Sequence, residues 1–305
     1  MEEHKRIPII CGPTGSGKTS VALEISKKHN VEIVSADSRQ IIKYLNIGTA
    51  KPTQVELNAC TFHLVDIIEP GERYSAFNFI DDAEQAIDTI AKQNKIPLIV
   101  GGTGLYLRAL TDGVVEIKQE DFSIREKLEI ELEEHGTEFM HRKLEAIDPL
   151  ESAKIHPNNK YRIVRALEIF YLTGHSKSEL LTTGKYRNSK HKFTYYCLAP
   201  NRELLYERIN NRVDQMLIDG LVNELNDLVA LGYKDKIEKA NVIGYGELLQ
   251  HLDGHISFDE AIAMIKQNSR RYAKRQMTWF RKQAELTFFE ETAELIEAIQ
   301  VSLKT

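Results

Sequence analysis

A short apolar run at residues 7–11 leads into the sequence Gly12-Pro13-Thr14-Gly15-Ser16-Gly17-Lys18-Thr19, and apolar residues recur at helical spacing after it. The pattern GxxxxGK[ST] between a strand and a helix is typical of a phosphate-binding P-loop. Its glycines let successive backbone amides point into one concavity, and the helix N-terminus adds to this attraction for anions. The sequence therefore predicts a site for a di- or triphosphate. Lys18 supplies a charge to the phosphates, and the Thr19 hydroxyl is the predicted ligand of Mg²⁺.

Strand and helix patterns alternate around this loop. The predicted strands are residues 7–11, 31–34, 62–68 and 96–100, and the predicted helices between them are residues 18–29 and 75–93. Alternation of this kind favours a parallel sheet that is covered by helices. The expected fold is thus α/β, with a P-loop NTPase-like parallel sheet core.

The middle of the chain differs, because residues 118–195 show helical patterns only. Ser123 and Glu126 have the spacing of a helix capping box, and Gly136 is a candidate helix end. Strand character returns at residues 193–198. We therefore expect a core domain of residues 1–117 and 196–305 that carries an all-helical insertion domain, residues 118–195. The expected core elements after the insertion are helices at 203–232, with a break at Gly220, and at 258–283, and a last strand at 286–289.

The composition limits the class of protein. Hydrophobic residues make up 42% and charged residues 28% of the 305 residues, which excludes wholesale disorder. A net charge of −5 excludes a globally basic nucleic-acid coat but not a local basic surface. The three cysteines, Cys11, Cys60 and Cys197, form neither a zinc pattern nor a disulfide framework, so a reducing compartment is expected. No run approaches the roughly 18 apolar residues of a membrane helix.

One acidic residue stands out near the P-loop. An ordinary NTPase carries an acid at the end of a second core strand, but the run at 96–100 ends in Gly101-Gly102-Thr103-Gly104. Asp37 instead follows the strand at 31–34. Functional groups of a parallel sheet gather beyond the carboxyl ends of its strands, so Asp37 and the P-loop should face each other if their strands are neighbours. From the residues alone, Asp37 could bind Mg²⁺, cap a helix or accept a proton.

Several further segments resemble the tRNA dimethylallyltransferases, also called isopentenyltransferases, of the bacterial type. In chain order they are Asp37-Ser38-Arg39-Gln40, the segment 46–52, the segment 101–106, His156-Pro157-Asn158, the segment 162–168, the segment 208–212, Ile243-Gly244-Tyr245 and the segment 274–279. They extend over nearly the whole chain, and together they are far more specific than a P-loop alone.

The resemblance implies an activity. Such enzymes transfer a dimethylallyl group from dimethylallyl diphosphate to N6 of adenosine 37, adjacent to the anticodon of tRNA, and release diphosphate. It implies that residues 12–19 hold the diphosphate rather than ATP, with Mg²⁺ at Thr19. Arg212 matches a family arginine that reaches the diphosphate, and Asp37 matches the family's general base. Lys18, Thr19, Arg212 and Asp37 are thus the expected catalytic residues.

The resemblance also implies positions that contact the tRNA anticodon stem-loop. They are Asp37, Ser38, Arg39, Gln40, Thr103, Arg125, Tyr161, Arg162, Ile163, Val164, Arg165, Lys274 and Arg275. The apolar spacing of Ile163 and Val164 favours the core instead, and Thr103 could equally cap a helix. Residues 266–282 contain seven basic residues and no acids, with Tyr272, Trp279 and Phe280 among them. A solvated helix face usually includes acids, so this segment favours RNA binding.

Three alternatives remain at this point. An adenylate isopentenyltransferase shares the donor but needs neither an insertion nor a basic helix. A small-molecule kinase of the P-loop type would be expected to carry the missing acid. A GTPase-like RNA-binding module would be expected to show an NKxD motif, which is absent from the sequence. We expect a cytoplasmic monomer without membrane contact, and ATP could also occupy the P-loop.

Overall fold

The computed structural model describes residues 6–117, 121–283 and 285–304. The chain divides into two compact units: unit 1 comprises Met1–Asp112 and Ser189–Thr305, and unit 2 comprises Gly113–Asn188. Both transitions between the units lie a few residues earlier in the chain than the expected boundaries after residues 117 and 195. Since β7 (Phe193–Leu198) is a strand of the core sheet, the whole of this strand belongs to unit 1.

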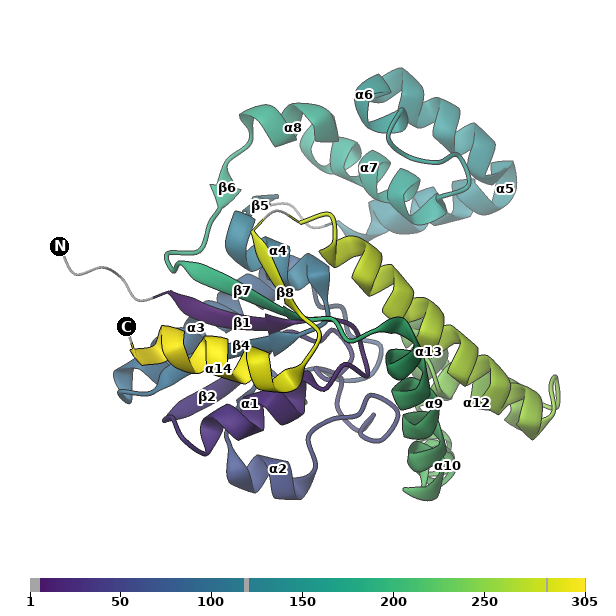
Figure 1. Ribbon diagram of the computed structural model, residues 1–305. Coiled ribbons are helices and arrows are strands. Elements are labelled where there is room, and N and C mark those ends of the chain that lie inside the picture. The colour runs from purple at the N-terminus through teal and green to yellow at the C-terminus, as the bar shows by residue number, and fades with distance from the viewer. Residues whose placement is uncertain (1–5, 118–120, 284, 305) are drawn as a thin grey trace. The chain divides into compact units, whose positions relative to one another are not determined.

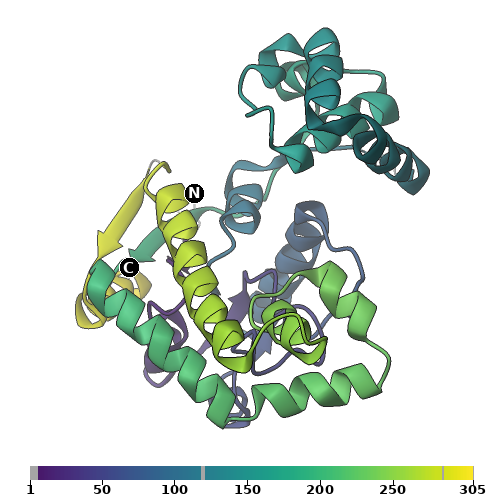
Figure 2. The same ribbon diagram turned by 90° about the vertical axis from the view of Figure 1, so that its right-hand side faces the viewer.

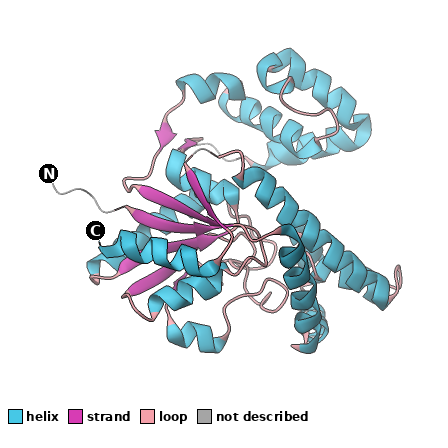
Figure 3. Cartoon of the chain, in the orientation of Figure 1, coloured by secondary structure: helices cyan, strands magenta, loops and turns pink. Residues whose placement is uncertain are grey.

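Unit 1 is built on a parallel sheet of six strands in the order β3-β2-β4-β1-β7-β8 (Figure 3). The other strands are β1 (Ile7–Cys11), β2 (Val31–Ser35), β3 (Phe62–His63), β4 (Ile96–Gly101) and β8 (Leu286–Phe289). This confirms the predicted α/β class and the parallel core. All the predicted strands are present, but one of them is much shorter than expected.

That strand is β3, which was expected over residues 62–68 and ends at His63. Leu64 and Asp66 adopt φ angles of 60° and 57°, a left-handed conformation that no strand contains. The chain turns there, and the backbone amides of Ile67 and Ile68 donate to the carbonyl of Ile41. The apolar residues of this segment therefore pack beside the loop after β2 instead of extending the sheet.

The sheet is covered by helices on both faces, because its strand residues alternate between two cores. Ile9 and Cys11 face the core with α3 (Ala76–Lys92) and α4 (Gly104–Asp112), whereas Ile10 faces the core with α1 (Lys18–Ser26) and α14 (Thr292–Lys304) (Figure 1). The predicted helices at 18–29 and 75–93 are confirmed, the second with Ser75 as its N-cap. Helix α14 lies outside the predicted elements.

A second group of helices in unit 1 has a core of its own around the buried Tyr245. It contains α9 (Arg202–Ile218), α10 (Leu221–Ala230), α11 (Lys234–Ala240), α12 (Tyr245–Leu252) and the long α13 (Phe258–Phe280). Gly220, with φ 99°, separates α9 from α10, as predicted. Figure 2 shows α9 and α13 running alongside each other. A short helix, α2 (Gln54–Ala59), follows the loop after β2.

Unit 2 consists mainly of helices around the buried Met140, Leu144 and Leu167. They are α5 (Phe122–Ile147), α6 (Pro149–Ser152), α7 (Lys160–Thr173) and α8 (Lys177–Thr183). Gly136 interrupts α5 with φ 78° and ψ 170°, so the predicted break is confirmed.

Two expectations for unit 2 are wrong. The unit is not all-helical, since β5 (Val114–Val115) and β6 (Tyr186–Arg187) pair antiparallel where the chain enters and leaves it. The first helix is capped by Asp121, whose carboxylate accepts from the Ser123 amide at 2.9 Å, and not by Ser123. Aspartate is as good an N-cap as serine, so the earlier acid starts the helix.

Candidate active site

The P-loop follows β1 and Asp37 follows β2, so both lie at the carboxyl edge of the sheet as expected. Their strands are not neighbours, because β4 lies between them. Gly101, the last residue of β4, and Gly102, which follows it, are both closely packed. A Cβ on Gly101 would lie 2.1 Å from the Ala36 carbonyl oxygen, and a Cβ on Gly102 would lie 2.4 Å from Nε2 of Gln276. Gly101 and Gly102 carry no side chains. The strand between β1 and β2 therefore adds none at the edge of the sheet where Asp37 and the P-loop lie.

The P-loop passes directly into α1 at Lys18. Gly15 and Gly17 have φ angles of 78° and 103°, which the loop requires and other residues rarely adopt. The Ser16 side chain is buried, and its Oγ has no hydrogen-bond partner within the part of the chain that the structure describes. A buried hydroxyl without a partner costs free energy unless a ligand or water completes it. The observation fits a cradle for phosphate oxygens.

The ammonium group of Lys18 is the positive charge within this cradle. Its Nζ donates to the Pro13 carbonyl at 2.7 Å. Burial lowers the pKa of the Lys18 ammonium to about 8, and Arg212 acts in the same direction, while Asp37 opposes the shift. Lys18 is therefore mostly protonated at neutral pH, and a bound anion would raise its pKa and so favour the charged form further.

Helix α9 brings two arginines to the P-loop, one turn apart. Nη1 of Arg212 donates to Oγ1 of Thr14 at 3.4 Å, and Nη1 of Arg208 donates to the Ser16 carbonyl at 3.3 Å. Burial lowers the pKa of the Arg212 guanidinium, and the Asp37 carboxylate opposes this. The predicted Arg212 is in place, whereas Arg208 was not predicted. Its i, i+4 spacing from Arg212, which puts both on one helix face, is the signal in the sequence.

Thr14 and Arg212 line a cavity of about 470 Å³ in unit 1, together with Asp37. Five of its lining residues are predicted site residues: Thr14, Asp37, Arg39, Arg212 and Arg275. The others include a largely apolar wall formed by Ile209, Val213, Met216, Val242, Ile243, Met264 and Ile265. The cavity therefore combines cations and a carboxylate with an apolar region.

Tyr272 of α13 also lines this cavity. Burial raises the pKa of its phenol to about 12, and Asp37 adds to the increase, while Arg39, Arg275 and Thr103 oppose it. The phenol therefore stays protonated at neutral pH. Tyr272 is not among the predicted site residues, although an aromatic residue between basic ones marks its position in the sequence.

Asp37 is held in a tight turn at the end of β2. Its Oδ1 accepts from the backbone amide of Arg39 at 2.9 Å. The amide of Ser38, which lies between Asp37 and Arg39, donates to Oγ1 of Thr103 at 2.9 Å. The Thr103 hydroxyl donates to Oγ of Ser38 at 3.3 Å. Thr103 thus fastens the turn that carries Asp37 through its side chain.

Two other predicted RNA contacts are engaged within the protein. The Gln40 amide donates to the Ala50 carbonyl at 2.9 Å and accepts from Oγ of Ser35 at 3.1 Å. Nη1 of Arg39 donates to the Ala240 carbonyl at 2.8 Å. Both side chains organise the loop after β2, and their contact with RNA stays a prediction.

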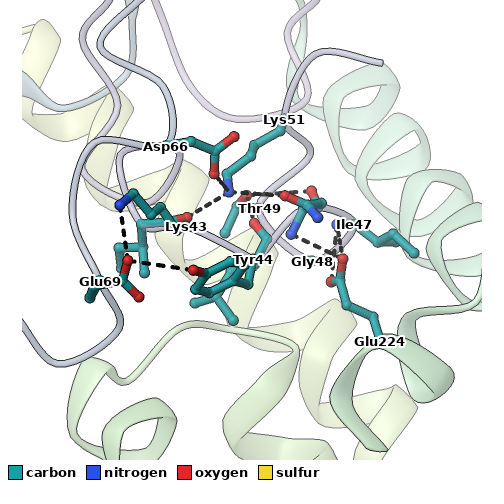
Figure 4. Close-up of polar contacts among 12 residues, drawn as sticks. Lys43, Tyr44, Ile47, Gly48, Thr49, Lys51, Asp66, Glu69 and Glu224 are labelled. Carbon is teal, nitrogen blue, oxygen red and sulfur yellow. Dashed lines mark hydrogen bonds and ion pairs between the residues drawn. The ribbon is translucent and has the colours of Figure 1, made fainter. Parts of the chain in front are cut away.

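The loop at residues 43–51 forms another wall of the cavity through Gly48 and Thr49. Figure 4 shows how it is fastened: Nζ of Lys51, inside the loop, pairs with Asp66, and the carboxylate of Glu224 accepts from the backbone amide of Ile47 at 3.1 Å. The buried Tyr245 donates to Glu224 at 2.5 Å and accepts from the Gly48 amide at 3.1 Å. Two carboxylates outside the loop, Asp66 and Glu224, therefore fix it at two points.

The basic segment at residues 266–282 begins in α13 and extends two residues past its end, and not all of its seven basic side chains are free at the surface. Lys266 pairs with Asp214, and Arg270 donates to Asn210 at 2.5 Å. The remaining five side chains are exposed: Arg271, Lys274, Arg275, Arg281 and Lys282. Arg275 also lies over the ring of Tyr272, 5.7 Å from its centroid.

In unit 2, Tyr161, Arg162 and Arg165 on α7 are exposed, as an RNA contact requires. Arg125 pairs with Glu129 at 2.9 Å. The predicted contacts of Ile163 and Val164 are wrong for their side chains. Ile163 is 0% and Val164 is 2% exposed, and both lie in the core of unit 2. They occupy the apolar stripe of α7, while the arginines lie on its other face.

The described residues contain no cluster of three or more His, Cys, Asp or Glu side chains suited to a metal ion. Mg²⁺ retains several waters and is commonly held by few protein groups together with substrate phosphates. Thr19, at the first turn of α1, fits this mode, since the buried Ser16 and the partly exposed Lys18 beside it form an anion cradle. The metal at Thr19 remains a prediction.

Comparison with known proteins shows the family. An IPP transferase family model matches residues 40–283, and an isopentenyl transferase model matches residues 5–66. The tRNA dimethylallyltransferase of Geobacter metallireducens is 44% identical over 289 residues, which cover 95% of this chain and 94% of that protein. That of Carboxydothermus hydrogenoformans is 42% identical over 305 residues, covering 99% and 97%. The chain belongs to the tRNA dimethylallyltransferase family.

Solved structures of the family agree with this. The tRNA isopentenylpyrophosphate transferase of Bacillus halodurans aligns with a TM-score of 0.69 and 38% identity, over 98% of this chain and 97% of that chain. A eukaryotic dimethylallyltransferase, described as acting on tRNA, aligns with a TM-score of 0.80 and 29% identity, over 93% and 73%. The resemblance inferred from the motifs is confirmed.

The lowered pKa of Lys18 generates a prediction. An anion favours the protonated lysine, so binding of inorganic diphosphate takes up a proton above about pH 8. The affinity should then fall up to about tenfold per pH unit as the pH rises further. Calorimetry from about pH 7 to about pH 9.5 measures this, with Lys18→Arg as control, because arginine is not deprotonated in proteins. The ratio of the two affinities cancels the titration of diphosphate itself, and a constant ratio would contradict the prediction.

Proposed function

We propose that the protein transfers a dimethylallyl group from dimethylallyl diphosphate to N6 of adenosine 37 in tRNA and releases diphosphate. The observation that carries the proposal is the cavity in which Thr14 of the P-loop and Arg212 lie together with Asp37. Cations and a carboxylate in one cavity suit a reaction that creates an anion and releases a proton. The family of the chain supports the substrates.

The cationic side of the cavity stabilises the leaving group. When the allylic C1–O bond breaks, its electron pair leaves with the diphosphate, and negative charge grows on that oxygen. Lys18, Arg212 and the P-loop amides are already in place around this charge. Donors that are fixed before the reaction stabilise the transition state more than the ground state. Mg²⁺ at Thr19 would neutralise further diphosphate charge when it is bound.

Asp37 acts on the other substrate. The N6 amino group of adenosine is a weak nucleophile, since its lone pair is delocalised into the ring. As the new N6–C1 bond forms, the Asp37 carboxylate accepts one N6 proton, and neutral secondary amine results. The backbone amide of Arg39 holds this carboxylate at 2.9 Å, so its orientation is set before substrate binds. General base catalysis of this kind contributes about 10²–10⁴-fold.

The remaining parts of the cavity have clear uses in this reaction. The apolar wall formed by α9, α13 and the segment before α12 suits the five-carbon group and keeps water from the allylic carbon. The target base must leave its stack to enter, which costs a few kcal/mol and less in a loop. The exposed basic residues of α13, beside the cavity through Arg275, supply contacts to the RNA backbone.

For the setting of this reaction, we expect a cytoplasmic monomer. Among the described helices, none is both long and apolar enough to cross a membrane. A tRNA substrate and reduced thiols are consistent with the cytoplasm, where Cys11, Cys60 and Cys197 would remain free as in the structure.

The decisive experiment is incubation of the purified protein and tRNA with either dimethylallyl diphosphate or ATP. Mass spectrometry of the digested nucleosides should show a dimethylallyl adduct on adenosine 37 with the first donor only. AMP in place of tRNA tests the adenylate alternative. Phosphoryl transfer from ATP, or prenylation of AMP alone, would overturn the proposal.

Asp37→Asn tests the general base. Asparagine keeps the oxygen that accepts the Arg39 amide, so the turn should persist while proton transfer is lost. We expect the single-turnover rate to fall about 10²–10⁴-fold with RNA affinity within about twofold of wild type. Rapid-quench kinetics and filter binding measure the two quantities. Transfer at nearly the wild-type rate would remove Asp37 from this role.

Lys274→Ala with Arg275→Ala tests the RNA surface. Loss of two phosphate contacts should weaken binding of the anticodon stem-loop and reduce the slope of log K against log salt by about 1–2. The matched control is Lys27→Ala with Lys28→Ala, two exposed lysines at the end of α1. An unchanged slope in the first pair, or an equal change in both pairs, would show that α13 presents only a solvated face.

A further inference from the structure

The side chain of Gln276 connects two loops of the site. Its Oε1 accepts from the backbone amide of Thr14 in the P-loop at 2.8 Å, and its Nε2 donates to the carbonyl of Gly102 at 2.9 Å. The residue is 7% exposed and lies on α13, directly after Lys274 and Arg275. One buried amide therefore bridges the loop after β1 and the turn after β4.

This position is selective for a glutamine. A carboxylate of the same size could accept from Thr14 but could not donate to Gly102. An apolar side chain would leave both a buried amide and a buried carbonyl unsatisfied, which typically costs about 1–3 kcal/mol for each group. The close approach also explains Gly102, because a Cβ there would lie 2.4 Å from Nε2 and 3.1 Å from the Gly12 carbonyl oxygen.

Each of the two loops belongs to a different half of the proposed reaction. On one side, Thr14 contacts Arg212 within the diphosphate cradle. On the other side, the glycine turn continues into Thr103, whose hydroxyl accepts from the amide of Ser38 next to Asp37. Gln276 thus lies between the cations that face the leaving group and the turn that carries the base.

The same hydrogen bond determines which P-loop donors remain for a ligand. Because the Thr14 amide is bound to Gln276, it points toward α13 and is not available to a phosphate. Of the amides that follow, that of Ser16 donates to the Pro13 carbonyl at 3.3 Å. The others remain for the anion, together with Oγ of Ser16, which has no hydrogen-bond partner among the described residues. A residue outside the P-loop, Gln276, thereby sets the orientation of the loop at Thr14.

We propose that Gln276 is a positioning residue that fixes the diphosphate cradle relative to the turn carrying Asp37. It touches neither substrate and acts through Thr14 and Gly102. This inference rests on the proposed function. It adds that one side chain of α13, the helix that also carries Lys274 and Arg275, aligns the two substrates.

Gln276→Met tests the inference, because methionine has a similar length and neither donates nor accepts strongly. We expect the Kd for inorganic diphosphate to rise about tenfold and the single-turnover rate at saturating substrates to fall by about tenfold or more. The Kd for the anticodon stem-loop should stay within about twofold of wild type. A purely structural role would lower only the fraction of folded protein and leave the diphosphate Kd unchanged.

Gln283→Met is the matched control. Gln283 follows the same helix, and among the described residues its Nε2 donates only to the Trp279 carbonyl, at 3.1 Å. Diphosphate binding and transfer rate should both match wild type in this variant. Gly102→Ala gives a second route, since its Cβ displaces the Gln276 amide while Gln276 itself is unchanged, and we expect the same weakening of diphosphate binding.

The outcomes separate the inference from the proposed function. A wild-type protein that binds diphosphate but prenylates no tRNA would overturn the function. A wild-type protein that prenylates tRNA, together with Gln276→Met and Gly102→Ala variants that retain its diphosphate Kd and rate, would overturn the role of Gln276 alone. Weaker diphosphate binding in Gln283→Met as well would also count against a specific bridge.

Discussion

The site depends on the absence of side chains at the end of β4. This strand lies between the strands that lead to the P-loop and to Asp37, so its last residues stand between the cations and the carboxylate. The Ala36 carbonyl and the Gln276 amide come so close that no Cβ fits at Gly101 or Gly102. A larger residue there would displace the backbone directly before Asp37 or the Gln276 amide that holds the P-loop at Thr14.

Electrostatics organises the space that this constraint leaves. Asp37 raises the pKa values of both Lys18 and Arg212, whereas burial lowers them. The carboxylate therefore helps to keep the buried cations charged before an anion arrives. A diphosphate would take over that role when it binds, because opposite charges at short range favour the ionised forms. The attraction of Lys18 and Arg212 for Asp37 would then be weaker, and the Asp37 carboxylate could accept the proton of the amine.

Much of this arrangement could be predicted from the sequence, because local patterns and the motifs encode it. The P-loop, most core strands, the breaks at Gly136 and Gly220, and the placement of Asp37, Thr14 and Arg212 in one site follow from them. Strand order could not be predicted, since it depends on long-range pairing. The hydrogen-bond partners of Gln276 and Tyr245 could not be predicted either. The sequence pattern around a buried polar side chain does not indicate which distant residue it will bond to. The left-handed turn after His63 is likewise invisible in an apolar run.

The short ladder between β5 and β6 brings the two ends of unit 2 together. Val115 and Tyr186 are paired across it, so unit 2 departs from and returns to unit 1 at adjacent points. A tight hairpin could close the same gap, and the six-stranded sheet would keep every strand. The helical unit is therefore an insertion that could change in length or be shortened to a turn without rebuilding the core.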